Sequence, residues 1–331
     1  MNLNGKKCVV IGGAGLIGSH TVDKLLRYDI KELVIFDNFV RGTNQNLENA
    51  LKDPRVKIFE AGGDIRNTDI LSSALNGADC VFHFAALWLL QCYEYPRAAF
   101  DVNITGTFNV LEACRDNGIK KIVFSSSASV YGDAIEEPMS ESHPFNNRTF
   151  YGATKIAGEA MCTAFYERYK VPYVGLRYMN VYGPRQDYRG AYIAVIMKML
   201  DSIDRGEALK VFGDGSQAYD FISVYDCAEA NICAMESSIE DRFYNVGTGL
   251  RTSIKELANL VNKLSGSNRG IEYMAEGQTF VKNRIADIKN AQNDINFVAK
   301  VSLDQGLKDL IEWRDSHKLE VEQRRAAAGI D

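Results

Sequence analysis

The chain has 331 residues, of which 46% are hydrophobic and 24% charged, and this composition excludes a disordered protein. Its formal net charge of −5 argues against a free-standing nucleic-acid binder, because such proteins are usually basic. No apolar run approaches the roughly 18 residues of a membrane span, so we expect neither nucleic acid nor a membrane as a partner. The seven cysteines form no Cys-x-x-Cys pair and no signal peptide precedes them, which predicts reduced thiols in a cytoplasmic protein.

Short β-branched runs alternate with helical patterns in the first half of the chain. The expected strands cover residues 9–11, 33–36, 56–59, 80–83 and 122–124, and the expected helices about 16–28, 44–51, 68–76 and 97–117. This alternation predicts an α/β fold with a doubly wound parallel (Rossmann) sheet. After residue 180 the pattern loosens. Helices expected at about 191–205, 225–237 and 253–265 predict a smaller mixed α/β lobe over the open end of the sheet.

A glycine-rich turn follows the first expected strand and opens the first helix. It reads Gly12-Gly13-Ala14-Gly15-Leu16-Ile17-Gly18. Glycines allow a sharp turn and let a diphosphate approach the backbone, whose N–H groups and positive helix end hold the anion. Such turns also join strands to helices for purely steric reasons. Together with its strand–helix context, the turn predicts a dinucleotide site.

Two aspartates follow the second and third expected strands. Asp37 comes 19 residues after Gly18, where a carboxylate accepts hydrogen bonds from a ribose diol and repels a 2′-phosphate, so NAD is favoured over NADP. Arg41 would favour NADP if it reached the ribose, but we interpret it as a solvated loop residue. Asp64 is placed to reach the adenine amino group; the alternative is a carboxylate that caps its own loop.

Tyr151 and Lys155 lie four residues apart on an expected helix and therefore share one face. A free phenol has a pKa near 10 and is a poor base at neutral pH. An ammonium group about 4 Å away contributes about 4 kcal/mol at an effective dielectric constant near 20, equal to nearly three pKa units at most. The positive charge of an oxidised nicotinamide ring would also lower the pKa of the phenol. We therefore expect Tyr151 to act as a base near pH 7, with a serine from the run 125–127 bonded to the reacting oxygen.

These motifs together resemble the extended short-chain dehydrogenase/reductase family, in particular its nucleotide-sugar epimerase branch, which includes UDP-galactose and UDP-N-acetylglucosamine 4-epimerases. The resemblance spans roughly residues 6–315. Its motifs are the glycine turn, Asp37-Asn38, Gly63-Asp64-Ile65, His83-Phe84-Ala85-Ala86, Val102-Asn103-x-x-Gly106-Thr107, the serine run before Val130-Tyr131-Gly132, Tyr151 with Lys155, and the segment 177–184. The resemblance implies a homodimer paired through the helices at about 97–117 and 151–169.

The resemblance also implies the roles of individual residues. Ser127, Tyr151 and Lys155 are the implied catalytic residues, and no metal is expected. The implied cofactor residues are Gly12, Gly15, Leu16, Ile17, Gly18, Asp37, Asn38, Asp64, Ile65, Ala85, Ala86, Asn103, Ser125, Tyr151, Lys155 and Tyr178, with Tyr178 near the nicotinamide. The expected substrate residues are Ser127, Asn180, Tyr192, Phe212 and Arg284. His83 is expected to be a satisfied histidine at a strand end.

In the family, NAD takes a hydride from carbon 4 of a nucleotide-linked sugar and returns it to the other face of the ring, while the tyrosine takes the hydroxyl proton. Related dehydratases carry an Asp-Glu pair where this chain has Ala128 and Ser129, and related decarboxylases keep the glutamate. Neither residue here is an effective acid, so we expect C4 epimerisation of a UDP-sugar. The alternatives are an NAD(P)H-dependent reductase of a nucleotide-linked 4-keto sugar and a non-catalytic NAD-binding regulator.

The substrate end departs from the family pattern. Tyr219 stands where an arginine usually contacts the substrate diphosphate, and the segment 274–278 lacks a second expected arginine. Arg284, or one of Lys282, Arg185, Arg189 and Lys210, is the expected replacement. The apolar run 87–90 stands where polar residues are usual, and it suits a deoxy or N-acyl sugar or a packed loop.

The domain division follows from these assignments. Residues 1–180 are expected to form an NAD-binding Rossmann domain that carries the catalytic residues. Residues 181–317 are expected to form mainly the substrate lobe, with some strands and helices returning to the first domain. Residues 318–331 are expected to be a frayed helical tail without function.

Overall fold

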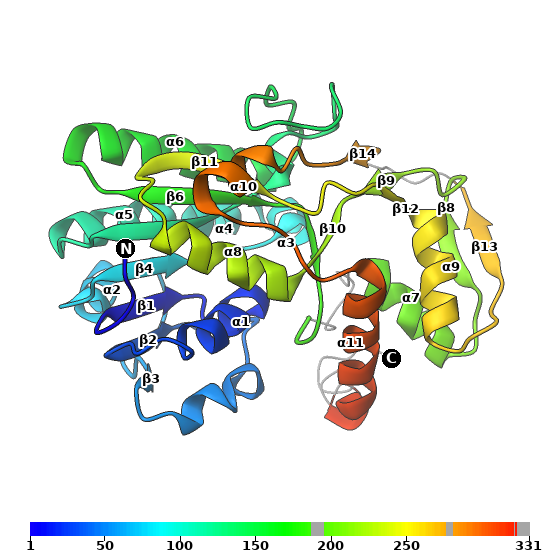
Figure 1. Ribbon diagram of the computed structural model, residues 1–331, viewed down its shortest axis with the longest axis horizontal. Coiled ribbons are helices and arrows are strands. Elements are labelled where there is room, and N and C mark those ends of the chain that lie inside the picture. Colours follow the sequence, from blue (N-terminus) through cyan, green and yellow to red (C-terminus); the bar gives the residue numbers. More distant parts are fainter. Residues whose placement is uncertain (187–194, 276–280, 321, 323–331) are drawn as a thin grey trace.

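The computed structural model describes residues 1–186, 195–275, 281–320 and 322. A sheet of seven parallel strands lies at its centre, in the order β11-β6-β5-β4-β1-β2-β3 (Figure 1). Its strands are β1 (Lys7–Ile11), β2 (Glu32–Phe36), β3 (Val56–Ile58), β4 (Cys80–His83), β5 (Lys121–Ser127), β6 (Tyr173–Tyr178) and β11 (Asp241–Val246). The strand order reverses between β1 and β4, and ligands of such sheets bind outside the carboxyl ends of the strands at that point.

The central strands are buried on both faces, which explains their uninterrupted apolar sequences. In β1, Cys8 and Val10 belong to one hydrophobic core, while Val9 and Ile11 belong to a second core on the opposite face. Successive side chains of a strand point to opposite faces, so an apolar run serves two cores at once. All five strands expected in the first half of the chain are confirmed.

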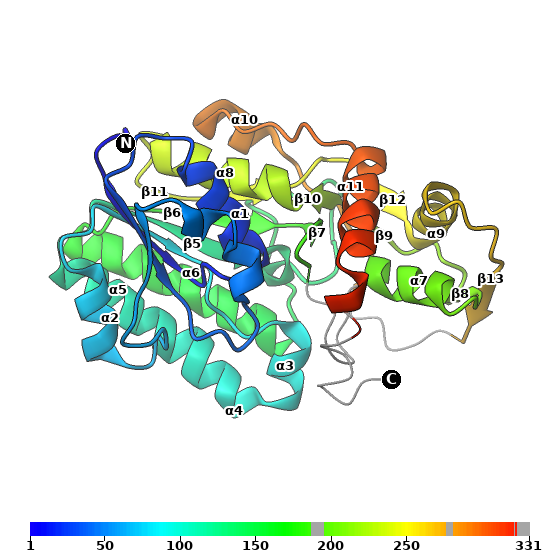
Figure 2. The same ribbon diagram turned by 90° about the horizontal axis from the view of Figure 1, so that it is seen from below.

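Helices cover both faces of the sheet (Figure 2). The helices α1 (Leu16–Leu25) and α8 (Val224–Glu236) pack on one face, and α2 (Thr68–Leu75), α5 (Thr107–Asp116) and α6 (Phe150–Tyr169) pack on the other. The predicted doubly wound α/β class is therefore confirmed. Both α8 and β11 come from the second half of the chain and return to this sheet.

Two expected helices differ in detail. The segment expected at 97–117 is α4 (Pro96–Ala99), a π-helical stretch (Phe100–Gly106) and then α5, and it follows α3 (Leu89–Glu94). Gly106 lies against the Ile65 side chain, where a Cβ would come within 2.5 Å. The segment expected as a helix at 44–51 forms two 3₁₀ turns, because the Asn46 amide ties it to the Ala14 carbonyl of the glycine turn at 2.8 Å.

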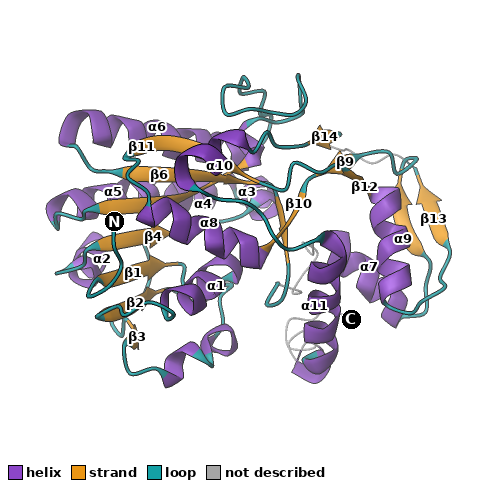
Figure 3. Ribbon diagram, viewed as in Figure 1, coloured by secondary structure: helices purple, strands orange, loops and turns teal. Residues whose placement is uncertain are grey.

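The second lobe lies beside the sheet and consists of short sheets and helices (Figure 3). Its strands are β7 (Asn180–Tyr182), β8 (Leu209–Phe212), β9 (Ala218–Tyr219), β10 (Phe221–Ser223), β12 (Thr252–Ser253), β13 (Ile271–Met274) and β14 (Asn283–Arg284). Its helices are α7 (Val195–Asp204), α9 (Ile254–Leu264) and α11 (Leu303–Ser316), whereas α10 (Lys289–Ile295) packs with α8 in the core of the central sheet. α11 packs against Tyr182 through Gly306 and onto α7 through the buried ion pair of Arg314 and Asp201. The domain boundary near residue 180 stays a prediction.

Two searches of the described residues gave negative results. None of the described helices combines the length and apolar character that crossing a bilayer requires. Among the same residues, no cluster of three or more His, Cys, Asp or Glu side chains is arranged to hold a metal ion.

Candidate active site

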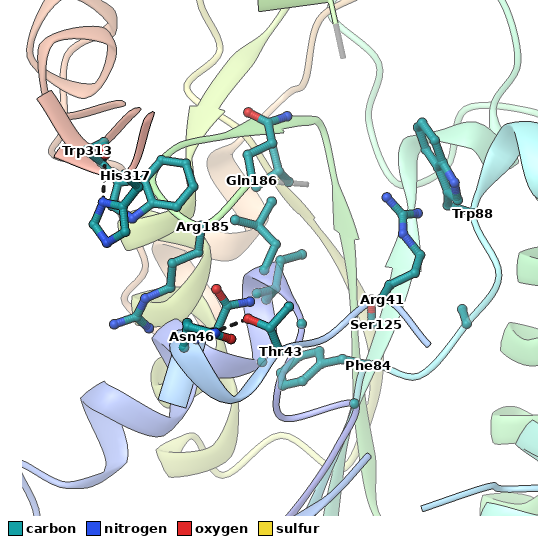
Figure 4. Close-up of a pocket in the computed structure, with 18 of the residues that line it drawn as sticks. Arg41, Thr43, Asn46, Phe84, Trp88, Ser125, Arg185, Gln186, Trp313 and His317 are labelled. Atoms are coloured by element: carbon teal, nitrogen blue, oxygen red, sulfur yellow. Dashed lines mark hydrogen bonds between the residues drawn. The ribbon is translucent and has the colours of Figure 1, made fainter. Parts of the chain in front are cut away.

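A cavity of about 550 Å³ opens beyond the carboxyl ends of β1, β4 and β5 (Figure 4). The lining residues come from the glycine turn, the loops after β2 and β4, helix α6 and the segment after β6. From the predicted set they are Gly12, Gly15, Leu16, Ile17, Gly18, Ala86, Ser125, Tyr151 and Lys155. The structure thus brings the glycine turn and the tyrosine–lysine pair to one cavity.

The geometry of the glycine turn explains why it requires glycine. Gly12 has φ of +79°, and a Cβ there would come within 2.7 Å of the Ala85 backbone nitrogen. A Cβ on Gly18 would lie 2.1 Å from the Gly12 carbonyl oxygen. Gly15 is the N-cap of α1 and supplies no side-chain cap, so the first N–H groups of that helix lack a capping side chain at the cavity wall. Such a helix start is suited to an anion.

The two aspartates order the loops beside this turn. The Asp37 carboxylate accepts backbone N–H bonds from Ala14 at 2.9 Å and Phe39 at 2.8 Å, while burial raises its pKa. Asn38 accepts a bond from the Val40 amide at 3.2 Å. The Asp64 carboxylate is held by the Arg66 guanidinium at 2.6 Å, and these hydrogen bonds keep the pKa of Asp64 low. Asp37, Asn38, Asp64 and Ile65 lie outside the lining of the cavity, so their contacts with a cofactor stay predictions.

The three residues implied in catalysis, called the trio below, are Ser127 at the end of β5 and Tyr151 and Lys155 in the first turns of α6. The Thr149 hydroxyl caps α6 by accepting the Gly152 N–H at 3.0 Å, which places Tyr151 in the first turn. The Tyr151 hydroxyl is hydrogen-bonded to the Ser127 side chain. The Lys155 Nζ donates to the Ser125 carbonyl at 2.7 Å and lies 5.6 Å from the centroid of the Tyr151 ring.

The expected net lowering of the Tyr151 pKa is not found. Burial raises the pKa of Tyr151 to about 12, and the opposing influences are the Ser127 hydrogen bond and the charges of Arg284 and Arg41. Burial also lowers the pKa of Lys155 to about 8. The sequence estimate assumed a close, solvated ammonium group, whereas this one is buried and bonded to Ser125. Desolvation disfavours both charged forms, so the trio alone does not generate a phenolate.

Three further predicted residues lie away from the cavity lining. Asn103 uses its amide to hold the loop after β4, accepting the Leu87 N–H at 2.7 Å and donating to the Leu87 carbonyl at 2.8 Å. Tyr178 donates to Asn231 of α8 at 2.6 Å and belongs to a hydrophobic core. Ala85 is partly buried and packs against the other core. In place of Tyr178, its neighbours Met179 and Val181 line the cavity.

The histidine at the end of β4 is buried as expected, but only one of its ring nitrogens is satisfied, because Nδ1 has no hydrogen-bond partner among the described residues. His83 is buried, and its Nε2 is hydrogen-bonded to the Thr107 hydroxyl at 3.1 Å. Burial lowers its pKa to about 3, so the ring is neutral and does not titrate near pH 7. His83 is not among the residues that line the cavity.

Of the predicted substrate residues, Asn180, Phe212 and Arg284 lie in the second lobe, whereas Ser127 ends β5, and none of these four lines the cavity. Asn180 begins β7, and Phe212 ends β8 with 52% of its surface exposed. Arg284 of β14 donates to the Gly132 carbonyl at 3.3 Å, and its Nε has no hydrogen-bond partner among the described residues. Burial lowers the pKa of Arg284 to about 10, and its charge influences Tyr151. Tyr192 lies outside the described residues.

Two arginines line the cavity; from the sequence, Arg41 was interpreted as a solvated loop residue, and Arg185 was one of several candidates for contact with the substrate diphosphate. Arg41 lies over the Trp88 ring, 4.5 Å from its centroid, so it is a cavity residue and not a solvated loop arginine (Figure 4). Arg185 pairs with Asp23 at 2.7 Å, and its Nη1 has no hydrogen-bond partner within the described chain. Its positive charge beside the glycine turn is suited to a diphosphate.

The C-terminal helix also reaches this cavity. Trp313 and His317 stack with ring centroids 5.0 Å apart, and both line the wall together with Glu320 (Figure 4). Glu320 of the expected tail thus lies at the cavity wall, whereas residues 321 and 323–331 lie outside the described part, and the expectation that the tail from residue 318 has no function stays a prediction. These residues are far from the glycine turn in the sequence, and no local sequence pattern indicates that they line the same cavity.

The two tryptophans of the chain, Trp88 and Trp313, line opposite sides of the cavity (Figure 4). We expect NAD to change the intrinsic tryptophan fluorescence, because a bound dinucleotide alters the surroundings of both rings. A fluorescence titration with NAD tests this, and Trp88→Phe and Trp313→Phe should each remove part of the signal. An unchanged spectrum at NAD saturation, with binding verified by calorimetry, contradicts the assignment of this cavity.

The chain belongs to the NAD-dependent epimerase/dehydratase family, whose model matches residues 8–247. It is 36% identical over 311 residues to a candidate UDP-glucose 4-epimerase of Methanocaldococcus jannaschii, covering 92% of this chain and 97% of that protein. The predicted extended short-chain dehydrogenase/reductase family is thereby confirmed.

Solved structures agree with this assignment. A UDP-N-acetylglucosamine 4-epimerase of Methanobrevibacter ruminantium, in complex with UDP-N-acetylmuramic acid, superposes with a TM-score of 0.89 at 36% identity, covering 95% of this chain and 99% of that one. The UDP-glucose 4-epimerase of Thermus thermophilus, in complex with NAD, gives a TM-score of 0.82 at 29% identity, with 93% and 99% covered. The comparisons confirm the predicted enzyme class, nucleotide-sugar epimerase, and NAD as its cofactor.

Proposed function

We propose that the protein inverts carbon 4 of a UDP-sugar through a transient 4-keto sugar. The observation that carries this proposal is the meeting of Tyr151 and Lys155 with the glycine turn at one cavity, with Ser127 hydrogen-bonded to Tyr151 behind the cavity lining. Two similar proteins support the UDP-sugar class, since one is a candidate UDP-glucose 4-epimerase and the other a UDP-N-acetylglucosamine 4-epimerase. The Trp88 ring in the cavity wall favours an N-acyl or deoxy sugar among these.

The residues present fit NAD. The start of α1 has no capping side chain and faces the cavity, and Arg185 adds an N–H donor at the cavity wall that finds no hydrogen-bond partner among the described residues. Both features favour a diphosphate. Gly15 has no Cβ, so a ligand can approach its backbone closely. A Cβ built there would have only the Gly12 carbonyl oxygen nearby, at 3.4 Å. Asp37 is our proposed acceptor for the adenosine ribose.

The mechanism divides between the cofactor and the chain. Bound NAD would supply the hydride chemistry at C4, in which the hydride leaves one face of the sugar ring and returns to the other. Tyr151 takes the proton of the 4-hydroxyl group, and Ser127 orients that oxygen through its hydroxyl. The Lys155 ammonium, fixed by the Ser125 carbonyl, stabilises the phenolate. Arg284, Asn180, Phe212 and Tyr192 are our proposed substrate contacts.

The chain lacks the acids that dehydration requires. Ala128 and Ser129 follow Ser127 directly, and both are buried. The Ser129 backbone N–H donates to the Ser127 hydroxyl at 3.1 Å, so this turn positions the serine and carries no carboxylate. Elimination across C5 and C6 needs an acid and a base near those carbons, so we infer that the keto sugar returns to an alcohol.

NMR of UDP-hexoses and UDP-N-acetylhexosamines incubated with the protein and NAD tests this function. We expect inversion at C4 of at least one UDP-sugar without net consumption of cofactor. Stoichiometric oxidation of NADH by a 4-keto sugar, with no inversion of any UDP-sugar, would instead identify the reductase alternative. Neither reaction, in protein that binds NAD, would favour the non-catalytic regulator.

We infer that the protein is a homodimer paired through α5 and α6. Phe108 and Tyr169 are 41% and 47% exposed and flank the Phe165 ring, which forms an aromatic surface across both helices. Light scattering at micromolar concentration should give twice the monomer mass, and Phe108→Glu should give the monomer. Val298→Glu, at an exposed site far from these helices in sequence, is the control. A monomeric native protein contradicts this proposal.

We also infer that the protein works in the cytoplasm. All seven cysteines are free and six are buried, which is typical of small apolar groups in a reducing compartment.

A further inference from the structure

A buried ion pair lies one helical turn beyond Lys155. The Glu159 carboxylate of α6 accepts hydrogen bonds from Arg177 of β6, from Nε at 2.9 Å and from Nη2 at 2.7 Å. Both side chains are almost fully buried, with 5% and 6% of their surface exposed. The Ser126 hydroxyl donates to the same carboxylate at 2.5 Å. A buried carboxylate with three such bonds is firmly held in place.

Arg177 extends this network to other parts of the fold. Its Nη1 donates to the Tyr131 hydroxyl at 2.8 Å and to the Glu141 carbonyl at 2.9 Å. The Tyr131 hydroxyl in turn donates to Asn245 of β11 at 2.7 Å. The network therefore joins α6, the end of β5, the following loop, β6 and β11 into one rigid unit.

Ser126 connects this network to the catalytic trio. It lies between Ser125, whose carbonyl holds Lys155, and Ser127, whose hydroxyl is bonded to Tyr151. The backbone of these neighbours is continuous with Ser126, so fixing the Ser126 side chain restricts both contacts. Without the bond to Glu159, the end of β5 would lose its side-chain attachment to α6 at this point.

We propose that Glu159 is a positioning residue for the epimerase reaction, which anchors the Ser125–Ser127 strand end through Ser126 and places a carboxylate one helical turn from Lys155. This inference rests on the proposed function. It assigns Glu159 no contact with substrate or cofactor, because its carboxylate is bonded to Arg177 and Ser126.

The charged surroundings of Lys155 support the second part of this role. The titratable groups that influence or face Lys155 are Tyr151, Glu159 and Cys162 of α6, Cys92 of α3 and His83 of β4. Of these, only Glu159 is a carboxylate. Burial lowers the pKa of Lys155 to about 8, and Cys92, Glu159 and Cys162 act against that lowering when they carry a negative charge. Burial raises the pKa of both thiols, so neither is a thiolate near neutral pH, and the carboxylate paired with Arg177 is the remaining group of the three.

The pH profile of the holoenzyme tests both parts, with variants Glu159→Gln and Ser126→Ala. Glu159→Gln removes the charge, so Lys155 should lose its proton at lower pH, and the alkaline fall of kcat should shift to lower pH. Ser126→Ala removes only the anchoring hydroxyl. It should lower kcat about tenfold to a hundredfold through misplacement of the trio, with little change in the pH profile. Asp201→Asn, which breaks the buried pair with Arg314 in the other lobe, is the matched control and should leave the profile unchanged.

Each outcome decides the inference. An alkaline limb that does not move in folded Glu159→Gln, or one that moves equally in Asp201→Asn, overturns it. If Glu159→Gln does not fold, an unchanged kcat in Ser126→Ala overturns it. A wild-type protein inactive on every UDP-sugar contradicts the proposed function instead. The tyrosinate titration of Tyr151 in the NAD complex then decides this inference, since Glu159→Gln should shift that titration to higher pH.

Discussion

Tyr151→Phe is expected to lower the rate of C4 inversion by about 100- to 10,000-fold, the range that positioned acid–base groups contribute. The substitution removes only the hydroxyl that exchanges the proton with the sugar. The ring keeps its place at the start of α6, so folding and NAD affinity should stay near those of the native protein. NMR rates and calorimetric NAD titrations on the same samples measure both effects.

Tyr169→Phe is the matched control for this substitution. Tyr169 ends the same helix, is 47% exposed and is not among the cavity residues. It should keep native activity. A Tyr151→Phe protein that inverts C4 at more than about one tenth of the native rate contradicts the assignment of Tyr151 as the base.

Gly18→Ala is expected to abolish NAD binding and to destabilise the fold. Its Cβ would lie 2.1 Å from the Gly12 carbonyl oxygen and 2.9 Å from the Gly13 Cα, and both atoms belong to the backbone. The first turn of α1 must then move away from β1, which displaces the helix start that faces the diphosphate. Overpacking of this kind costs about 1–3 kcal/mol, measurable as a lower Tm.

Gly270→Ala is the control, because a Cβ at Gly270 would meet no atom within 4 Å. It should keep the native Tm and the native affinity for NAD. Native NAD affinity in Gly18→Ala would show that the cofactor does not need this close approach of helix and turn.

The sequence was informative where one physical requirement leaves a local pattern. The parallel strands were predictable because burial on both faces demands apolar runs such as Val9-Val10-Ile11. The glycine turn was predictable because Gly12 and Gly18 lie where a Cβ meets backbone atoms. Tyr151 and Lys155 were brought together by the helical period alone.

The sequence was less informative where contacts depend on distant segments. The walls formed by Trp313 and His317, and the inward position of Arg41, arise only when remote parts of the chain come together. Tyr178 was placed near the nicotinamide by resemblance, but its hydroxyl finds Asn231 of α8, 53 residues further along the chain. The pKa of Tyr151 was misjudged because spacing gives proximity but not burial.

Because burial raises the pKa of Tyr151, we infer that this residue becomes a base at neutral pH only when oxidised NAD lies in the cavity. The direct measurement is a tyrosinate absorbance titration, taken as the difference between native protein and Tyr151→Phe, with and without NAD⁺. Without cofactor we expect the transition near pH 12, because burial disfavours the phenolate. With NAD⁺ the added positive charge should move it several units lower, toward neutrality. An identical transition in both states would contradict the account.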